Sequence, residues 1–210
     1  MSSVDPTMLY AWLAARSVAR GLPAPVPDHG GFRVDTNSDT EIKRWVFPHV
    51  SKGLAELGRT LDAPRHLLKL CGTADELRAA LPHGWQLLPA AYVMTATREW
   101  VERPLPAGYA IKVSRDGPVI EAQVIFGGGA PAAKGYAAEG RDVFIYDRIA
   151  TAPEHRRKGL GHAVMFALSN ARLNREAAQV LVATEEGRAL YTTLGWRMLS
   201  PYSTASIPGA

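Results

Sequence analysis

The sequence predicts an α+β fold in which helices flank a mixed, mostly antiparallel central sheet. Residues 85–138 carry short β-type segments separated by turn signals. Residues 142–174 read as a strand, a glycine turn and an amphipathic helix, and a second strand and helix follow by residue 196. The result is a mostly antiparallel sheet into which a strand–turn–helix–strand unit is inserted.

The chain before residue 90 is expected to form an N-terminal α/β extension. Asp5 can cap a helix that runs to about Arg20, where Gly21 ends it. The elements expected after this helix are a stiff proline-rich loop over residues 22–31, strands at Phe32–Thr36 and Glu41–Phe47, and two or three short helices within residues 51–81.

The β-rich region that follows is divided by glycine turns. Asp116-Gly117 indicates a hairpin, and Gly127-Gly128-Gly129 is expected to be a turn between antiparallel strands. The expected strands are Trp85–Leu88, Tyr92–Thr97, Tyr109–Ser114, Val119–Phe126 and Lys134–Ala138.

The most informative segment begins with a strand at Val143–Thr151 and continues into a helix from Leu160. Gly159 and Gly161 let the first turn of this helix approach a ligand closely, while unpaired N–H groups and the positive end of the helix dipole point outward. The basic run from Arg156 to Lys158 adds mobile positive charge. These features predict a seat for a phosphate or pyrophosphate, as in a nucleotide cofactor.

The turn also carries a resemblance. Arg156-x-x-Gly159-x-Gly161 after a strand resembles the signature (Arg or Gln)-x-x-Gly-x-(Gly or Ala) of the GNAT superfamily of acetyl-CoA-dependent acyltransferases. A second match follows, in which the strand Val180–Ala183 precedes a helix that ends in Leu190-Tyr191-Thr192-Thr193-Leu194-Gly195-Trp196. The resemblance covers about residues 142–200 and fades toward residue 92. It implies a GNAT-like sheet and a catalytic domain at residues 91–210, with residues 1–90 as the extension.

The resemblance implies how acetyl-CoA, the co-substrate, would bind. In this family the cofactor lies between two central strands that splay apart. The backbone of Ile149, Ala150 and Thr151 would therefore bond the pantetheine amides. The residues that would hold the pyrophosphate are Arg156, Arg157, Lys158, Gly159, Leu160 and Gly161.

Acyl transfer to an amine needs an acid for the leaving thiolate, and Tyr191 matches the family's tyrosine at that place. With a reference pKa of about 10, a tyrosine stays neutral and can donate a proton. The alternative is that Tyr191 is only a packing residue between Leu190 and Leu194.

The base is less defined by the sequence. Asp147 alternates with Ile149 and Thr151 on one strand face, so it can point toward the incoming amine. The alternative is an ion pair between Asp147 and a neighbouring arginine, either Arg148 or Arg141. Glu185 and Glu186 are the second candidates for the base. Both are also explained as first-turn residues that favour the dipole of a helix capped by Thr184. Ordered water can also remove the proton once the amine is held against the thioester.

The function expected from the resemblance is transfer of an acetyl group to a primary amine of a small molecule in a ternary complex. An amino acid, a polyamine and an aminoglycoside-type amino sugar all remain open as acceptors. Protein or peptide N-acetylation is the rival activity, and a non-catalytic acyl-CoA-binding module is the alternative of another class.

Residues 1–90 are expected to shape the acceptor pocket, because they lie outside the recognised cofactor unit. The candidates there are Trp12, Trp45, Trp85, Arg33 and Asp35, and the tryptophans suit a core equally well. A polycationic acceptor would need an acidic cleft, which an acidic group in this region can supply. Its members are Asp28, Asp35, Asp39 and Glu41.

Composition excludes several other classes. The formal net charge is +4, and the positive residues are dispersed except at Arg156–Lys158, so nucleic-acid binding is not expected. The six histidines show no paired ligand spacing, so no metal site is expected. Cys71 is the single cysteine, which fits a reducing compartment. It lies far outside the family motif and has no adjacent base, so a thiol intermediate is not expected. No export signal or membrane-spanning run is seen in the sequence, so a cytoplasmic location is expected. A homodimer is left open.

Overall fold

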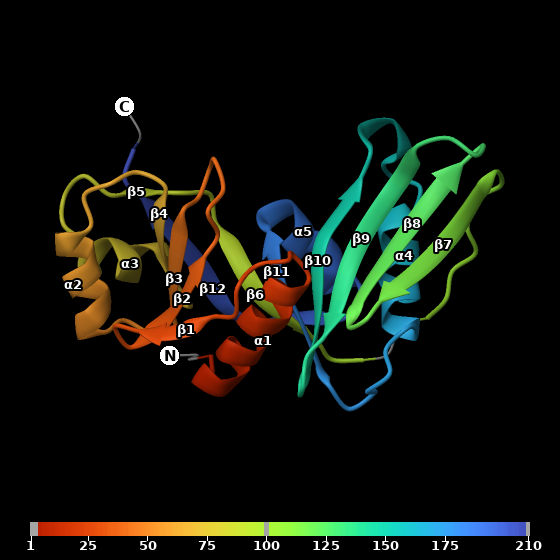
Figure 1. Ribbon diagram of the computed structural model, residues 1–210. Coiled ribbons are helices and arrows are strands. Elements are labelled where there is room, and N and C mark those ends of the chain that lie inside the picture. Colours follow the sequence, from red (N-terminus) through yellow and green to blue (C-terminus); the bar gives the residue numbers. More distant parts are fainter. Residues whose placement is uncertain (1–3, 99–100, 209–210) are drawn as a thin grey trace.

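The computed structural model describes residues 4–98 and 101–208, whose strands form one twelve-stranded sheet in two lobes (Figure 1). The order of the main path is β1-β2-β3-β4-β12-β6-β11-β10-β9-β8-β7, with β5 paired to β12. The strands are β1 (Val26–Asp28), β2 (Gly31–Asp35), β3 (Lys43–Phe47), β4 (His66–Leu70), β5 (Gln86–Leu87), β6 (Ala91–Ala96), β7 (Tyr109–Asp116), β8 (Val119–Phe126), β9 (Pro131–Glu139), β10 (Val143–Thr151), β11 (Ala178–Thr184) and β12 (Trp196–Ser206).

The sheet is mostly antiparallel, as predicted. Among the described strands, only the pairs β3–β4 and β10–β11 are parallel. The helices are α1 (Pro6–Val18), α2 (Lys52–Thr60), α3 (Ala74–Ala80), α4 (Leu160–Asn170) and α5 (Glu185–Thr193). The predicted α+β class is confirmed.

Helices cover both faces of the sheet. One apolar core joins α4 to strands β8–β10 and includes Phe144, Val164 and Leu168. A second core lies on the opposite face, where α1 contributes Leu9, Trp12 and Leu13. A third core fills the N-terminal lobe between its sheet, α2 and α3. These cores hold β10 and β11 between α1 on one side and α4 on the other.

Several predicted boundaries agree with the structure. Asp5 caps α1 by accepting hydrogen bonds from Thr7 and Met8, and β10 spans the predicted Val143–Thr151. Thr184 caps α5, as expected. The prediction did not include β4, whose five residues follow Pro64 in a region read as helical, or β12, which begins at Trp196, the last residue of the second family motif.

The division at residue 90 stays a prediction, and two elements cross it. The N-terminal helix α1 packs against β9 and β10, far along the chain. The C-terminal strand β12 pairs first with β6 and then, from Ser203 onward, with β4. Both lobes are therefore built from distant parts of the sequence.

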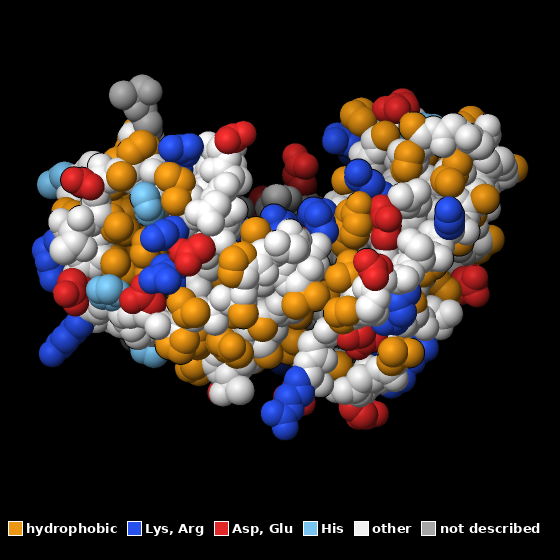
Figure 2. Space-filling view, in the orientation of Figure 1, with side chains coloured by type: hydrophobic (Ala, Val, Ile, Leu, Met, Phe, Trp, Pro, Cys, Tyr) orange, Lys and Arg blue, Asp and Glu red, His pale blue; other side chains and the backbone are white. Residues whose placement is uncertain are grey.

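A hollow separates the two lobes. In the space-filling view it opens at the top of the molecule, and Lys or Arg side chains lie at its floor (Figure 2). The strands β6 and β11 and the helix α1 lie between the lobes at this place (Figure 1). The candidate site lies in this region.

Candidate active site

The two parallel strands β10 and β11 separate at their carboxyl ends. Their pairing starts at Val143 and Ala178 and ends at Tyr146 and Leu181, although β10 continues to Thr151 and β11 to Thr184. Unpaired strand ends leave main-chain groups without a ladder partner, so the opening can bind an extended ligand. This separation is the splay that the family resemblance implies.

A β-bulge produces the separation. The register of β9 and β10 shifts between Asp147 and Ala150, and Arg148 has a left-handed φ of 54°. A bulge bends its strand and leaves a residue unpaired. Non-glycine residues in this backbone region are uncommon and gather at functional sites. The bend carries the end of β10 away from β11.

The bulge also corrects one expectation. Asp147 does not share a face with Ile149 and Thr151. Asp147 lies near Arg16 of α1, and Arg148 donates to Ala19 at its C-cap, whereas a Cβ placed on Gly135 would lie 2.3 Å from Ile149 Cδ1 and 2.8 Å from Val164, a residue of α4. The extra residue at Arg148 breaks the two-residue alternation, so the chain changes face there.

Main-chain groups in the second half of β10 point in alternating directions. The Ala152 N–H donates to Ala132 O on β9 at 2.9 Å. Strand alternation then directs the amide groups of Ala150 toward β9 and those of Thr151 and Ile149 toward the opening. Two of the three predicted pantetheine contacts therefore face the opening.

The turn before α4 has the features of an anion seat. Gly159 occupies the N-cap with a φ of 77°, and no side chain caps the helix. The N–H groups of the first turn are thus left to a ligand. A Cβ on Gly161 would make only ordinary van der Waals contacts, the nearest at 3.8 Å from Thr151 Oγ1 on β10, so no protein atom crowds this position. Arg156, Arg157 and Lys158 are exposed.

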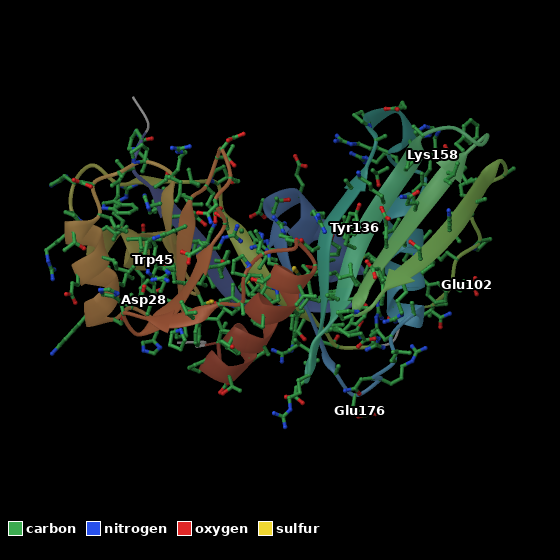
Figure 3. All side chains as sticks on the ribbon, viewed as in Figure 1. Asp28, Trp45, Glu102, Tyr136, Lys158 and Glu176 are labelled. Carbon is green, nitrogen blue, oxygen red and sulfur yellow. The ribbon has the colours of Figure 1, made fainter. Side chains whose placement is uncertain are left out.

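Lys158 is held more firmly than the sequence indicates. Its Nζ donates to Tyr109 Oη at 3.0 Å, and Tyr109 Oη in turn lies 2.8 Å from His155 Nδ1. Phe126 packs on the ring of Tyr109. These contacts attach the turn to the end of the β7–β8 hairpin, and Lys158 lies high on that lobe (Figure 3). The mobile charge at the turn therefore comes from Arg156 and Arg157.

A pocket of about 300 Å³ lies in the opening between β10 and β11. It is bounded by α1, the two strands and α5. The residues that line it are Trp12, Arg16, Arg20, Tyr146, Asp147, Arg148, Ile149, Leu181, Val182, Ala183, Thr184, Gly187 and Tyr191. The pocket therefore joins the predicted catalytic tyrosine to residues of the N-terminal helix.

Tyr191 is buried, with 8% of its surface exposed, and burial raises its pKa to about 12. Its ring packs against Trp196 at a centroid distance of 6.0 Å. Tyr191 therefore packs in the core and also lines the pocket. At neutral pH its hydroxyl is protonated, which is the state that a proton donor needs.

Asp147 is surrounded by arginines. Its carboxylate accepts two hydrogen bonds from Arg20, at 2.6 and 2.8 Å, and lies 3.4 Å from Arg148 and 3.7 Å from Arg16. Burial raises the pKa of Asp147, but the Arg20 hydrogen bond and the three positive charges outweigh it, so the pKa lies below its ordinary value. The ion pair with Arg148 is present, whereas Arg141 pairs with Asp142. A carboxylate in these surroundings is a weak base.

Glu185 lies outside the lining of the pocket. Tyr92 Oη donates to its carboxylate, and Arg188 Nε donates to the same group at 3.1 Å. The hydrogen bond from Tyr92, followed by that from Arg188, lowers the pKa of Glu185. Glu185 and Glu186 occupy the first turn of α5, where they favour its dipole.

Sequence reasoning did not identify Arg16 and Arg20 as site residues. A signal was present, because Trp12, Arg16 and Arg20 are spaced four apart and so share one face of a helix. Trp12 shows that this face is buried, and arginines on a buried face need a partner or a ligand. Of the other acceptor candidates, Trp45 and Trp85 belong to the core of the N-terminal lobe.

Splayed parallel strands, an uncapped glycine turn and a buried tyrosine are the features that the family resemblance leads one to expect. Comparison with known proteins agrees with this resemblance over part of the chain. A family model described as an acetyltransferase (GNAT) domain matches residues 115–198. The predicted family is supported over residues 115–198, which match the GNAT acetyltransferase domain, and the solved structures described next share the fold.

Solved structures share the fold over the whole chain. A GCN5-related N-acetyltransferase from Kribbella flavida has a TM-score of 0.69 and 16% identity, covering 99% of this chain and 97% of that chain. A GCN5-related N-acetyltransferase from Sphaerobacter thermophilus has a TM-score of 0.60 and 10% identity, covering 99% and 96%. A search of curated proteins found no match.

Two further properties concern only the described residues. Within residues 4–98 and 101–208, no helix has the length and apolar character needed to cross a membrane. In the same residues, no group of three or more His, Cys, Asp or Glu side chains is arranged to hold a metal ion.

Proposed function

We propose that this protein transfers the acetyl group of acetyl-CoA directly to a primary amine of a small molecule, with both substrates bound together. The observation that carries the proposal is the pocket in the opening of β10 and β11, which connects the strand ends to Tyr191 and α1. Members of this family generally use acetyl-CoA, and the uncapped start of α4 fits its pyrophosphate.

The cofactor would bind along the end of β10. The N–H groups of the turn from Gly159 to Gly161, with Arg156 and Arg157, would hold the pyrophosphate. The main-chain groups of Thr151 and Ile149 would bond the pantetheine amides, which leads the thioester into the opening. The acceptor amine would then approach from the side of α1.

The chemistry forms one bond and breaks one bond. The amine nitrogen attacks the acetyl carbonyl carbon, the carbon–sulfur bond breaks, the nitrogen loses a proton and the thiolate gains one. Tyr191 would protonate the thiolate, since its hydroxyl is neutral and lines the pocket. An alkyl amine with a pKa near ~10 must first lose a proton, at a cost of about 4 kcal/mol at neutral pH.

The surroundings of Asp147 favour a positioning role over that of base. Three arginines stabilise its charge and reduce its basicity. We therefore assign removal of the amine proton to ordered water and assign to Asp147 the positioning of Arg20 and Arg16.

Cys71 does not line the pocket, and burial raises its pKa to about 12, which favours direct transfer over a thiol intermediate. We place the protein in the reducing cytoplasm as part of this proposal.

The experiment measures acetyl-CoA binding by calorimetry and release of the CoA thiol with a panel of amines. Wild-type protein is expected to bind acetyl-CoA and to acetylate small amines. Tyr191→Phe is expected to bind acetyl-CoA equally well and to lose about 10²- to 10⁴-fold in kcat. Full turnover by Tyr191→Phe would remove the assignment of the acid. Activity on peptides but not on small amines would favour the rival activity, and binding without turnover would favour a binding module.

A further inference from the structure

The wall of the pocket on the side of α1 has an excess of positive charge. Its charged residues are three arginines, Arg16, Arg20 and Arg148, and one carboxylate, Asp147. The exposed fractions of the arginine side chains are 21%, 28% and 41%, whereas Asp147 is 10% exposed. The single buried carboxylate therefore neutralises only part of the charge of the three arginines, which a ligand in the pocket can reach.

Arg16 is the arginine with the fewest partners. Its Nε lies 3.7 Å from Asp147, which is too long for a hydrogen bond, and its guanidinium lies 5.6 Å from the ring centroid of Trp12. No acceptor within the described residues takes a hydrogen bond from it. Burial lowers the pKa of Arg16, and the charge of Arg20 lowers it further. A guanidinium has five N–H donors in a planar fork, a geometry suited to a carboxylate or phosphate.

The other two arginines are fixed by the protein. Arg20 uses two N–H groups on Asp147, and Arg148 donates to Ala19 O and lies over the ring of Tyr136 at 4.0 Å. Figure 3 shows Tyr136 on the lobe of β9, beside the hollow. The positive wall is thus pre-organised, and Arg16 is the side chain left to bind a ligand.

Nearby groups do not reverse this charge. Glu41 interacts electrostatically with Arg16 and Arg20, but its carboxylate forms an ion pair with Arg44, and Lys69 lies close enough to influence its pKa. Glu41, Arg44 and Lys69 together carry one negative and two positive charges, so they add net positive charge near Arg16.

The acidic residues considered for a polycationic acceptor lie elsewhere. Asp28 accepts a hydrogen bond from Trp45 Nε1 at 2.8 Å and pairs with Arg33, and Asp35 pairs with Arg33 at 3.2 Å. Asp28 and Trp45 lie together in the opposite lobe from Tyr136 (Figure 3). None of the four predicted acidic residues lines the pocket. The pocket therefore lacks the charge that a polyamine or aminoglycoside would require.

We propose that the acceptor is an amine that also carries an anionic group, a carboxylate or a phosphate, and that Arg16 binds this group while the amine faces the thioester. This inference rests on the proposed function and narrows it. Amines with a carboxylate or phosphate separated by a few bonds fit a pocket of about 300 Å³.

The test uses pairs of amines that differ in the anionic group. β-Alanine is compared with propylamine, and O-phosphoethanolamine with ethanolamine, while spermidine represents cationic acceptors. We expect kcat/KM to be at least about tenfold higher for the member that carries the anionic group in one of the two pairs. The pair that shows this difference identifies the anionic group as a carboxylate or a phosphate. Arg16→Gln should lower kcat/KM for the acceptor with the anionic group by about 10- to 100-fold and change kcat/KM for the partner that lacks this group by less than about threefold.

The controls separate charge from folding. Arg59→Gln removes an exposed positive charge from the last turn of α2 and should leave the preference unchanged. Arg16→Lys keeps the charge but loses the fork, so it should retain part of the preference. Acetyl-CoA affinity and melting temperature are measured for each variant.

The outcomes distinguish this inference from the proposed function. Transfer to spermidine, or to the amines that lack an anionic group, with equal or higher kcat/KM would overturn the inference and leave the proposed function standing. An equal loss on both members of a pair in Arg16→Gln would also overturn it. Failure to acetylate any amine, or to bind acetyl-CoA, would contradict the proposed function and the inference together.

Discussion

The interaction of Asp147 with Arg20 gives the most detailed prediction. Two charge-assisted hydrogen bonds, at 2.6 and 2.8 Å, join Arg20, just after the end of α1, to the bulge of β10. Asp147 is 10% exposed and Arg20 is 28% exposed, so solvent screens the pair only partly. A hydrogen bond to a charged group contributes about 1.5–3 kcal/mol. We expect a coupling free energy in this range from a double-mutant cycle of Asp147→Asn and Arg20→Gln, measured by urea unfolding at neutral pH.

The same variants distinguish a base from a positioning residue. If Asp147 positions the arginines, each single variant should lower kcat/KM to a similar degree, and the double variant should be little worse than either. A base would behave differently, because Asp147→Asn alone would lose about 10²- to 10⁴-fold while Arg20→Gln kept turnover. That second pattern, or a coupling free energy below about 0.5 kcal/mol, would refute the reasoning.

The pH dependence of this contribution has a defined sign. The pKa of Asp147 is lower in the folded state than its ordinary value of 3.8, so the folded protein binds this proton less readily than the unfolded chain. The stabilisation is therefore complete well above pH 3.8 and is lost as the pH falls through the folded-state pKa. The difference in unfolding free energy between wild type and Asp147→Asn should accordingly be largest at neutral pH and shrink in acid. A difference that grows toward pH 3 would contradict this assignment.

Three other predictions concern the glycines and the tyrosine. Gly161→Glu should weaken acetyl-CoA binding at least about 100-fold in calorimetry, because a carboxylate would occupy the anion seat, whereas Gly161→Ala should fold normally; undiminished binding in Gly161→Glu would exclude the seat. Gly135→Ala should destabilise the protein by about 1–3 kcal/mol in thermal unfolding, since its Cβ would lie 2.3 Å from Ile149 Cδ1, and adding Ile149→Ala should restore part of that loss. Because the pKa of Tyr191 is raised to about 12, kcat should show no tyrosine-dependent loss between pH 7 and 10, and a Tyr191-dependent decrease below pH 10 would contradict a buried neutral donor.

Local patterns predicted the strand, turn and helices to which we assign the cofactor. Strand β10 is rich in β-branched and aromatic residues, Gly159 precedes an apolar-periodic helix, and Thr184 caps α5. Each of these features depends on neighbouring residues. They therefore fixed the strand, turn and helix, and the match to the family signature placed Tyr191 beside them.

The acceptor side depends on contacts between distant segments. Arg20 is 127 residues from Asp147 along the chain, and no local pattern indicates that α1 lies over the bulge. The bulge itself depends on Arg148 in a left-handed conformation, which a regular alternation of strand residues does not reveal. For this reason the sequence predicted one face for Asp147 and Ile149, whereas the structure places them on opposite faces of β10.

A structure of the protein with CoA tests the central claim most directly. The account predicts that the pyrophosphate accepts hydrogen bonds from the N–H groups of the turn at Gly159–Gly161, and that the thiol lies between β10 and β11 beside the hydroxyl of Tyr191. A pyrophosphate bound away from this turn, or a thiol outside the opening of the two strands, would contradict the account.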